Sequence, residues 1–147
     1  MERHIGIFQI KEELFLMVQP PSEKEHKLLW GGVLEFGNHF FCNANCILNA
    51  GDHIFFGDDV LLGWNCTIID GDGHGIISEC EKSSRHEPIE IGKHVWLASG
   101  ATILKGSKIR DGSCVAANGC ITKKFTDCNL LLGGFNKVLR KNIEWVR

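Results

Sequence analysis

The stretch IIDGDGHGII, residues 68–77, combines a side chain suited to proton transfer with a flexible backbone. The unperturbed pKa of a histidine lies near neutral pH, so His74 could take a proton from an attacking hydroxyl or amine. The glycines on both sides allow close backbone approach, and Asp72 or Asp70 could hydrogen-bond the far ring nitrogen. A polar turn is the alternative, because Asp-Gly pairs form turns without any chemistry.

The chain around this stretch follows a repeat of six residues. From Ile89 onward an aliphatic side chain recurs at the third place of each hexad: Ile91, Leu97, Ile103, Ile109, Val115 and Ile121. The same place can be followed upstream at Phe36, Cys42, Leu48, Phe56, Leu62 and Ile68. The first place of the later hexads is aliphatic or small. Neither a simple helix nor a plain hairpin sheet needs this period.

A hexad with one apolar and one small place suits a flat-sided solenoid. Each hexad would form a short strand and a corner, and three hexads would close one triangular coil. Successive coils would stack at about 4.8 Å, with the apolar places in a ladder inside the prism. The segment 69–88 interrupts this register, and loops of about twenty residues in compact domains are usually functional or disordered.

The segment IGKHVWLASGATILKGSKIRDGSCVAANGCITKKF, residues 91–125, closely resembles the hexapeptide-repeat acyltransferases. The resemblance implies a mainly all-β chain, a left-handed parallel β-helix with an extended catalytic loop and a C-terminal α-helix. A chain of 147 residues has the size of one domain. We expect an N-terminal cap at 1–33, the β-helix at 34–124 with its loop at 69–88, and a closing strand and helix at 125–147.

Both ends of the chain carry weaker signals. The stretches IGIFQI and FLMVQPP could be strands of the N-terminal cap. Near the other end, Leu139, Ile143 and Val146 follow at i, i+4 and i+7, which favours a helix that covers an open side of the prism. It would be entered through GGFNK, where the family usually has GNPAK, and this departure leaves the detail of the corner open.

The opening of the loop, D-x-D-x-H, resembles the catalytic loop of polysaccharide and sialic-acid O-acetyltransferases. This implies His74 as general base, with Asp72 as the neighbouring acid and Asp70 near the acceptor. Trp96 stands at the family's recurrent tryptophan, which implies a place beside the catalytic histidine of the next subunit. There its ring would line one side of the thioester site, and its indole N–H could donate a hydrogen bond to the oxyanion. Packing of Trp96 against a neighbour is the alternative, and the two interpretations are compatible.

The resemblance to sugar acetyltransferases also implies contacts with the donor and the acceptor. Ser99, Ala117 and Thr122 would lie along the pantetheine and nucleotide, and Lys123 would face phosphate, with Lys105 a weaker candidate for the same role. Asn43 would contact the acceptor. The alternatives are a solvated strand end for TKKF and an ordinary corner residue for Asn43.

The predicted activity is acetyl-CoA-dependent O-acetylation of a sugar or cell-surface polysaccharide, by direct transfer in a ternary complex. A homotrimer with active sites between subunits is the family's usual assembly. An N-acetyltransferase for an amino sugar, amine or antibiotic is one alternative, and a non-catalytic β-helix scaffold is another. No metal is expected, because His74, His86 and His94 lack the spacing of the metal-using γ-type carbonic anhydrases on this fold.

Composition argues against some classes of partner and location. A formal net charge of -2, from 16 basic and 18 acidic residues, argues against nucleic acid as a partner. No apolar run is long enough to cross a bilayer and no signal peptide is evident, so we expect a soluble cytoplasmic protein. The seven cysteines form no CxxC pair. Reduced thiols serving as small hydrophobes are the main interpretation, with a metal or disulfide role as the lesser one.

Overall fold

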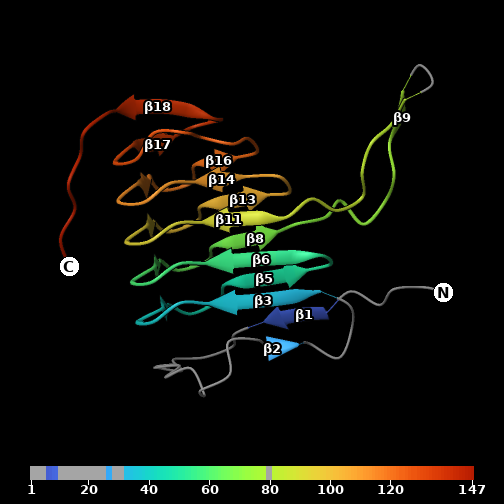
Figure 1. The fold of residues 1–147 in the computed structure, drawn as a ribbon, viewed down its shortest axis with the longest axis horizontal. Coiled ribbons are helices and arrows are strands. Elements are labelled where there is room, and N and C mark those ends of the chain that lie inside the picture. The colour runs from blue at the N-terminus through green and yellow to red at the C-terminus, as the bar shows by residue number, and fades with distance from the viewer. Residues whose placement is uncertain (1–5, 10–25, 28–31, 79–80) are drawn as a thin grey trace.

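The computed structural model describes residues 6–9, 26–27, 32–78 and 81–147, and this part of the chain is all-β. Short strands stack into a three-sided prism of parallel coils, and a long arm projects from it (Figure 1). We name the three faces A, B and C, and the chain passes through them in the order B, C and A on each coil. The prediction of a parallel β-helix is confirmed. Among the described residues no helix could span a membrane.

Each face of the prism is one sheet. Face A contains β1 (Gly6–Gln9), β5 (Ile47–Ala50), β8 (Thr67–Ile69), β13 (Thr102–Leu104) and β16 (Cys120–Ile121). Face B contains β2 (His26–Lys27), β3 (Val33–Phe36), β6 (His53–Phe56), β11 (Ile89–Ile91) and β14 (Lys108–Ile109). Face C contains β4 (Phe41–Cys42), β7 (Leu61–Leu62), β12 (Trp96–Leu97), β15 (Cys114–Val115), β17 (Leu131–Gly133) and β18 (Lys137–Arg140).

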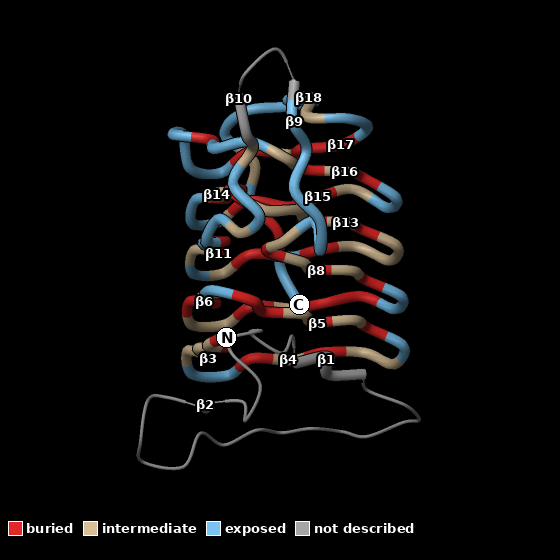
Figure 2. The backbone as a smooth tube through the Cα atoms, turned by 90° about the vertical axis from the view of Figure 1, so that its right-hand side faces the viewer, coloured by how far each residue is buried: buried red, intermediate tan, exposed pale blue. Residues whose placement is uncertain are grey.

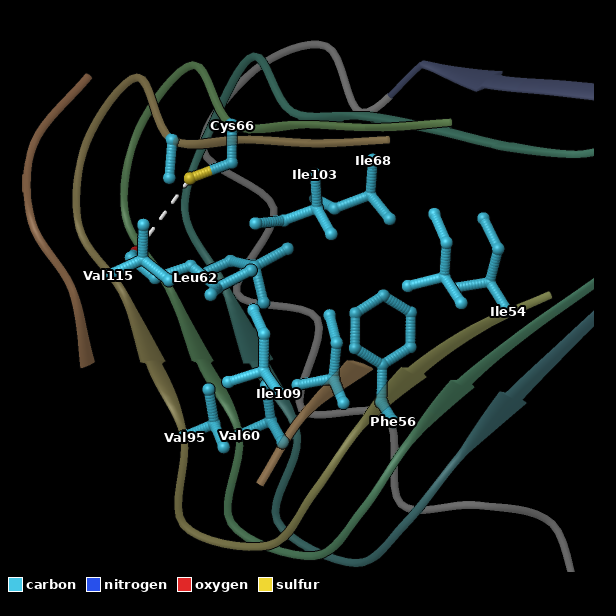
Figure 3. Close-up of a cluster of buried hydrophobic side chains, with 14 of the residues drawn as sticks. Ile54, Phe56, Val60, Leu62, Cys66, Ile68, Val95, Ile103, Ile109 and Val115 are labelled. Atoms are coloured by element: carbon cyan, nitrogen blue, oxygen red, sulfur yellow. Dashed lines mark hydrogen bonds between the residues drawn. The ribbon is translucent and has the colours of Figure 1, made fainter. Parts of the chain in front are cut away.

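The predicted apolar ladder forms the core of the prism. On face C the register stacks Cys42, Leu62, Leu97, Val115 and Leu132 on successive coils. Faces A and B do the same with the other third-place residues. Figure 3 shows six of the third-place side chains pointing into the prism: Phe56, Leu62, Ile68, Ile103, Ile109 and Val115. Buried residues recur along every coil in Figure 2. The period of six is therefore the period of burial.

The corners between faces need a left-handed backbone. At the corner between faces B and C, His39, Asp59, His94 and Asn129 have φ between 50° and 58°. Asn, Asp and His tolerate this region better than other residues with a side chain. His39 and His94 are therefore corner residues by backbone conformation. We call this column the B/C corner.

The predicted C-terminal α-helix is wrong. Residues 137–140 form β18, which pairs antiparallel with β17, and the closing segment (residues 141–147) follows without a helix. Asn136 and Asn142 adopt φ of 55° and 54°, which interrupts a right-handed helix. In place of a buried helical stripe, Leu139 and Val146 are exposed.

At the N-terminal end, β1 falls within IGIFQI as expected and pairs antiparallel with β5. The stretch FLMVQPP lies outside the described residues. The division of the chain into cap, β-helix and closing elements of a single domain stays a prediction.

Phe56→Ala should lower the free energy of unfolding by about 3–5 kcal/mol, because it leaves a cavity inside the prism. Phe56 is fully buried and its ring stacks 5.3 Å from that of Phe36. Phe135→Ala is the matched control, since Phe135 is 65% exposed and should change stability by less than about 0.5 kcal/mol. Urea denaturation measures both, and equal losses would contradict the burial assigned to Phe56.

Candidate active site

The interruption of the register is an arm (residues 70–88), which leaves the corner between faces A and B. Its tip is a ribbon of β9 (Ile77–Ser78) and β10 (Glu81–Lys82), which pair antiparallel. At its base Gly71 bridges His86, and the Asp72 amide donates to the Arg85 carbonyl at 3.0 Å. The arm is thus a two-stranded extension, and Figure 1 shows it projecting from the side of the prism.

Lys105 ties the two strands of the arm to the prism. Its ammonium group lies 2.5 Å from the Asp72 carboxylate and donates to the Ser84 carbonyl at 2.6 Å. Only 19% of the lysine side chain is exposed. Lys105 was the weaker candidate for donor phosphates, but its ammonium is engaged with the arm instead.

Asp70 anchors the base of the arm from inside. It is 1% exposed, and its carboxylate accepts hydrogen bonds from the amides of Gly51 at 2.7 Å and Asp52 at 2.8 Å. The His86 ring lies beside it, with Nδ1 3.7 Å from Asp70 Oδ1. The geometry therefore gives no support to an acceptor contact by Asp70, because its oxygens already serve the prism.

Glycine is required where the His86 ring packs. A Cβ added at Gly51 or Gly71 would lie 2.3 or 2.2 Å from ring atoms of His86. The ring therefore fills a slot between two coils, and this slot fixes the direction in which the second strand of the arm returns to the prism.

His74 lies in a bend of the outgoing half of the arm, before β9, and is exposed. The preceding Gly73 has φ of 72° with open space around its Cα, so the backbone turns freely there. The predicted pairing of His74 with an aspartate finds no support within this protomer, because Asp70 and Asp72 are both engaged elsewhere. The His74 side chain is therefore open to solvent in this protomer.

A groove of about 620 Å³ runs along face C. It brings together four residues singled out from the sequence, Asn43, Trp96, Ser99 and Ala117. Gly63, Ala98 and Ala116 also line it, so most of the lining side chains are small. A narrow chain could therefore lie against the backbone between the larger groups.

Trp64 and Cys114 are two of the other lining residues that the sequence analysis did not single out. Trp64 is 55% exposed and occupies the same hexad place as Ser99, one coil earlier. That equivalence was the signal available in the sequence. Cys114 lies directly beside Trp96 on the next coil. Burial raises the pKa of the Cys114 thiol to about 11, so it stays protonated at neutral pH.

Two predicted donor contacts lie outside the groove lining. Thr122 is engaged by Asn136, whose side-chain amide donates to Thr122 Oγ1 at 2.6 Å and whose oxygen accepts from the Thr122 amide at 2.8 Å. The Lys123 ammonium lies 5.0 Å from the centre of the Phe125 ring. The structure does not bring Thr122 and Lys123 together with Trp96 in this groove.

The arm and the groove are on opposite sides of the protomer. The arm leaves from the corner between faces A and B, whereas the groove lies on face C. In Figure 1 the arm projects on one side of the prism and the closing segment runs down the other. Among the described residues no cluster of His, Cys, Asp or Glu could hold a metal ion.

Comparisons with known proteins agree with this architecture. The galactoside O-acetyltransferase of Lactococcus lactis is 30% identical over 135 residues, which cover 90% of this chain and 62% of that protein. A maltose O-acetyltransferase structure from Clostridium difficile 630 superposes with a TM-score of 0.66 at 28% identity, over 76% of this chain and 60% of that one. A polysialic acid O-acetyltransferase structure gives 0.62 at 26%, over 80% and 61%. No family model matches the chain.

The fold is a parallel β-helix, and the relatives that share it are named as carbohydrate O-acetyltransferases. The chain is accordingly a homologue of the hexapeptide-repeat acetyltransferases, as the resemblance in its hexads predicted. It spans about three fifths of the length of these relatives.

Lys105→Met should loosen the arm without unfolding the prism. Hydrogen bonds to charged groups are worth ~1.5–3 kcal/mol, so amide exchange of Asp72 and Ser83 should accelerate by about tenfold or more. Lys108→Met is the matched control, because Lys108 is ion-paired with Glu90 on face B. Hydrogen exchange with mass spectrometry measures both. Equal protection of the arm in wild type and Lys105→Met would contradict the anchoring role of this lysine.

Proposed function

We propose that the protein transfers an acetyl group from acetyl-CoA to a hydroxyl of a sugar or polysaccharide. The observation that carries this proposal is the groove on face C, which gathers Asn43, Trp96, Ser99 and Ala117. Its small side chains suit a thin pantetheine arm, and its tryptophans suit a planar thioester. The names of the relatives supply the acceptor class, since all three act on carbohydrate hydroxyls by their printed descriptions.

In this mechanism His74 is the general base. It takes the proton of the acceptor hydroxyl while that oxygen attacks the thioester carbonyl, and backbone amides or the Trp96 indole stabilise the oxyanion. Collapse of the tetrahedral intermediate breaks the carbon–sulfur bond, and His74 returns the proton to the leaving thiolate. A covalent acetyl-enzyme is not required. The raised pKa of Cys114, caused by burial, supports this, because a protonated thiol is a poor nucleophile.

The active site would form between two copies of the chain. The arm with His74 leaves one side of the prism and the groove lies on another, so one protomer's arm would reach the groove of its neighbour. Ile76 and Ile77 on the arm are 63% and 74% exposed, which favours a protein surface as their partner. A closed ring of three copies, as expected from the resemblance, would repeat this contact three times.

The finer assignments rest on the same proposal. Asn43 would contact the acceptor, although its side-chain amide already donates to the Leu62 carbonyl at 3.1 Å. Lys123 would approach the donor phosphates, and Thr122 would contribute through its backbone.

No catalytic metal is needed for the proton transfers. A cytoplasmic location stays a prediction, and the six described cysteines are free thiols.

Acetylation of an amine on the same scaffold is the alternative activity. The carbohydrate O-acetyltransferases among the relatives favour a hydroxyl, and the acceptor assay below includes amino sugars and amines to decide between them.

His74→Ala should lower the rate of thiol release from acetyl-CoA by at least about 10²-fold, the usual size of a general-base contribution. The assay would follow free thiol with mono- and oligosaccharides, amino sugars and antibiotics as acceptors. His53→Ala is the control, because His53 lies in β6 on face B and is absent from the groove lining. If His74→Ala kept wild-type turnover with the acceptor that works best, the general base would lie elsewhere.

Mixing two inactive variants should restore activity if each site joins two copies. In trimers assembled from equal amounts of His74→Ala and Trp96→Ala, half of the arms and half of the grooves are intact, so about a quarter of the sites should be complete. Trimers of each variant alone are the control. Recovery of no activity after co-refolding, with trimers confirmed by light scattering, would show that arm and groove belong to the same protomer.

A further inference from the structure

The closing segment runs down the B/C corner and touches four coils on its way. The Ile143 amide donates to the Asn129 carbonyl at 3.0 Å, Trp145 stacks on His94, and Arg147 pairs with Asp59 at 2.8 Å. Arg147 also donates to the His39 carbonyl at 3.3 Å. The path follows the column of left-handed corner residues, and these hold the segment through the side chains of Asp59 and His94 and the backbone carbonyls of Asn129 and His39.

Trp145 is the centre of these contacts and it is buried. Its ring lies parallel to the His94 ring at 4.0 Å, and its indole N–H donates to the His94 carbonyl at 2.9 Å. The indole also lies near Trp96, which lines the groove, with the two ring centres 6.0 Å apart and the rings tilted by 46°. Trp145 itself is absent from the groove lining. It therefore supports Trp96 from the side.

His94 meets a hydrogen-bond acceptor at each ring nitrogen. Nδ1 lies 2.5 Å from the Asp59 carboxylate, and Nε2 lies 3.0 Å from the Trp145 carbonyl. A neutral imidazole has one N–H and can satisfy only one of them. The imidazolium donates to both, so the geometry requires a protonated His94 when the closing segment is in place.

We propose that protonated His94 and Trp145 form a clasp that positions Trp96 at the groove, and that the clasp opens as His94 loses its proton. The clasp itself stands on its geometry alone. Its effect on donor binding rests on the proposed function, because it assumes that the groove of face C holds the acyl-CoA.

The electrostatic surroundings favour the charged form of His94. The hydrogen bond with Asp59 raises the pKa of His94 above its ordinary value near 6.5, and the Trp145 carbonyl adds to this, while burial and the positive charge of Arg147 oppose it. The nearby Asp58 and Lys93 pair with each other at 3.2 Å.

Because the pKa of His94 is raised, the stability of the clasp should depend on pH. A group with a raised pKa in the folded state stabilises that state fully below its ordinary pKa of about 6.5, and the stabilisation is lost as the pH rises through the raised value. The clasp should therefore be closed in mildly acidic solution and open at higher pH. Neutral His94 would leave one acceptor facing a lone pair, which favours release of Trp145.

Circular dichroism tests the clasp without any substrate. Two indoles 6.0 Å apart give a far-ultraviolet exciton couplet, which Trp145→Phe should abolish and thereby identify. In wild type the couplet should disappear as the pH rises through the His94 transition. In His94→Gln it should be weak at every pH, and in Asp59→Asn the transition should move down by about one pH unit or more.

His53→Gln is the matched control. His53 pairs with Glu35 at 3.3 Å on face B and does not contact the closing segment, so the couplet and its pH course should be those of wild type. Thermal melts of all variants check that the prism is folded. A full couplet in folded His94→Gln, with the wild-type pH course, would overturn the clasp.

Coenzyme A binding tests whether the clasp positions the groove. Calorimetry at mildly acidic pH should give about tenfold weaker binding to Trp145→Ala than to wild type, and the difference should vanish at high pH, where the clasp is open. Equal affinities at low pH, with the couplet behaving as expected, would overturn the positioning role. If wild type binds no coenzyme A, the proposed function fails, and the couplet still decides whether the clasp exists.

Discussion

Each coil of the prism must place one apolar side chain per face inside, because its strands are too short to hold together by themselves. Most of them contain two to four residues, and the stacked side chains supply the burial that single strands lack. Fixing the inward place also fixes the outward ones. Trp96 and Cys114 share one outward column of face C, and Trp64 and Ser99 share another. The groove is therefore a consequence of the register.

This dependence explains why much of the site could be predicted from the sequence. Once the period of six is known, Asn43, Trp96 and Ser99 must fall on the same face whatever the details of the corners. The arm is different, because it leaves the register. The engagement of Asp72 and Asp70 depends on Lys105 and on backbone amides a coil away, and no local pattern encodes those contacts. The sequence therefore suggested Asp70 and Asp72 as partners of His74, whereas in the fold these carboxylates bind backbone amides and Lys105.

The predicted helix failed for a related reason. The spacing of Leu139, Ile143 and Val146 is a local signal, but the last coil leaves the edge of β17 unpaired, and an open edge needs a cover. Pairing with β18 satisfies those backbone groups directly. Asn136 precedes β18 and Asn142 follows it, and their left-handed backbone conformation limits the strand at both ends. Closure of the end of the sheet is a tertiary requirement, and it outweighed the helical spacing of Leu139, Ile143 and Val146.

The two groups proposed to act on the substrates are held by charged contacts on opposite sides of the prism. The arm that carries His74 is held by the Lys105 ammonium, which contacts the Asp72 carboxylate and the Ser84 carbonyl. Trp96 is supported through Trp145 and His94, and the proposed clasp depends on the charge of that histidine. Loss of the proton from His94 would therefore alter the wall of the donor groove, while the contacts that Lys105 makes with the arm involve other residues.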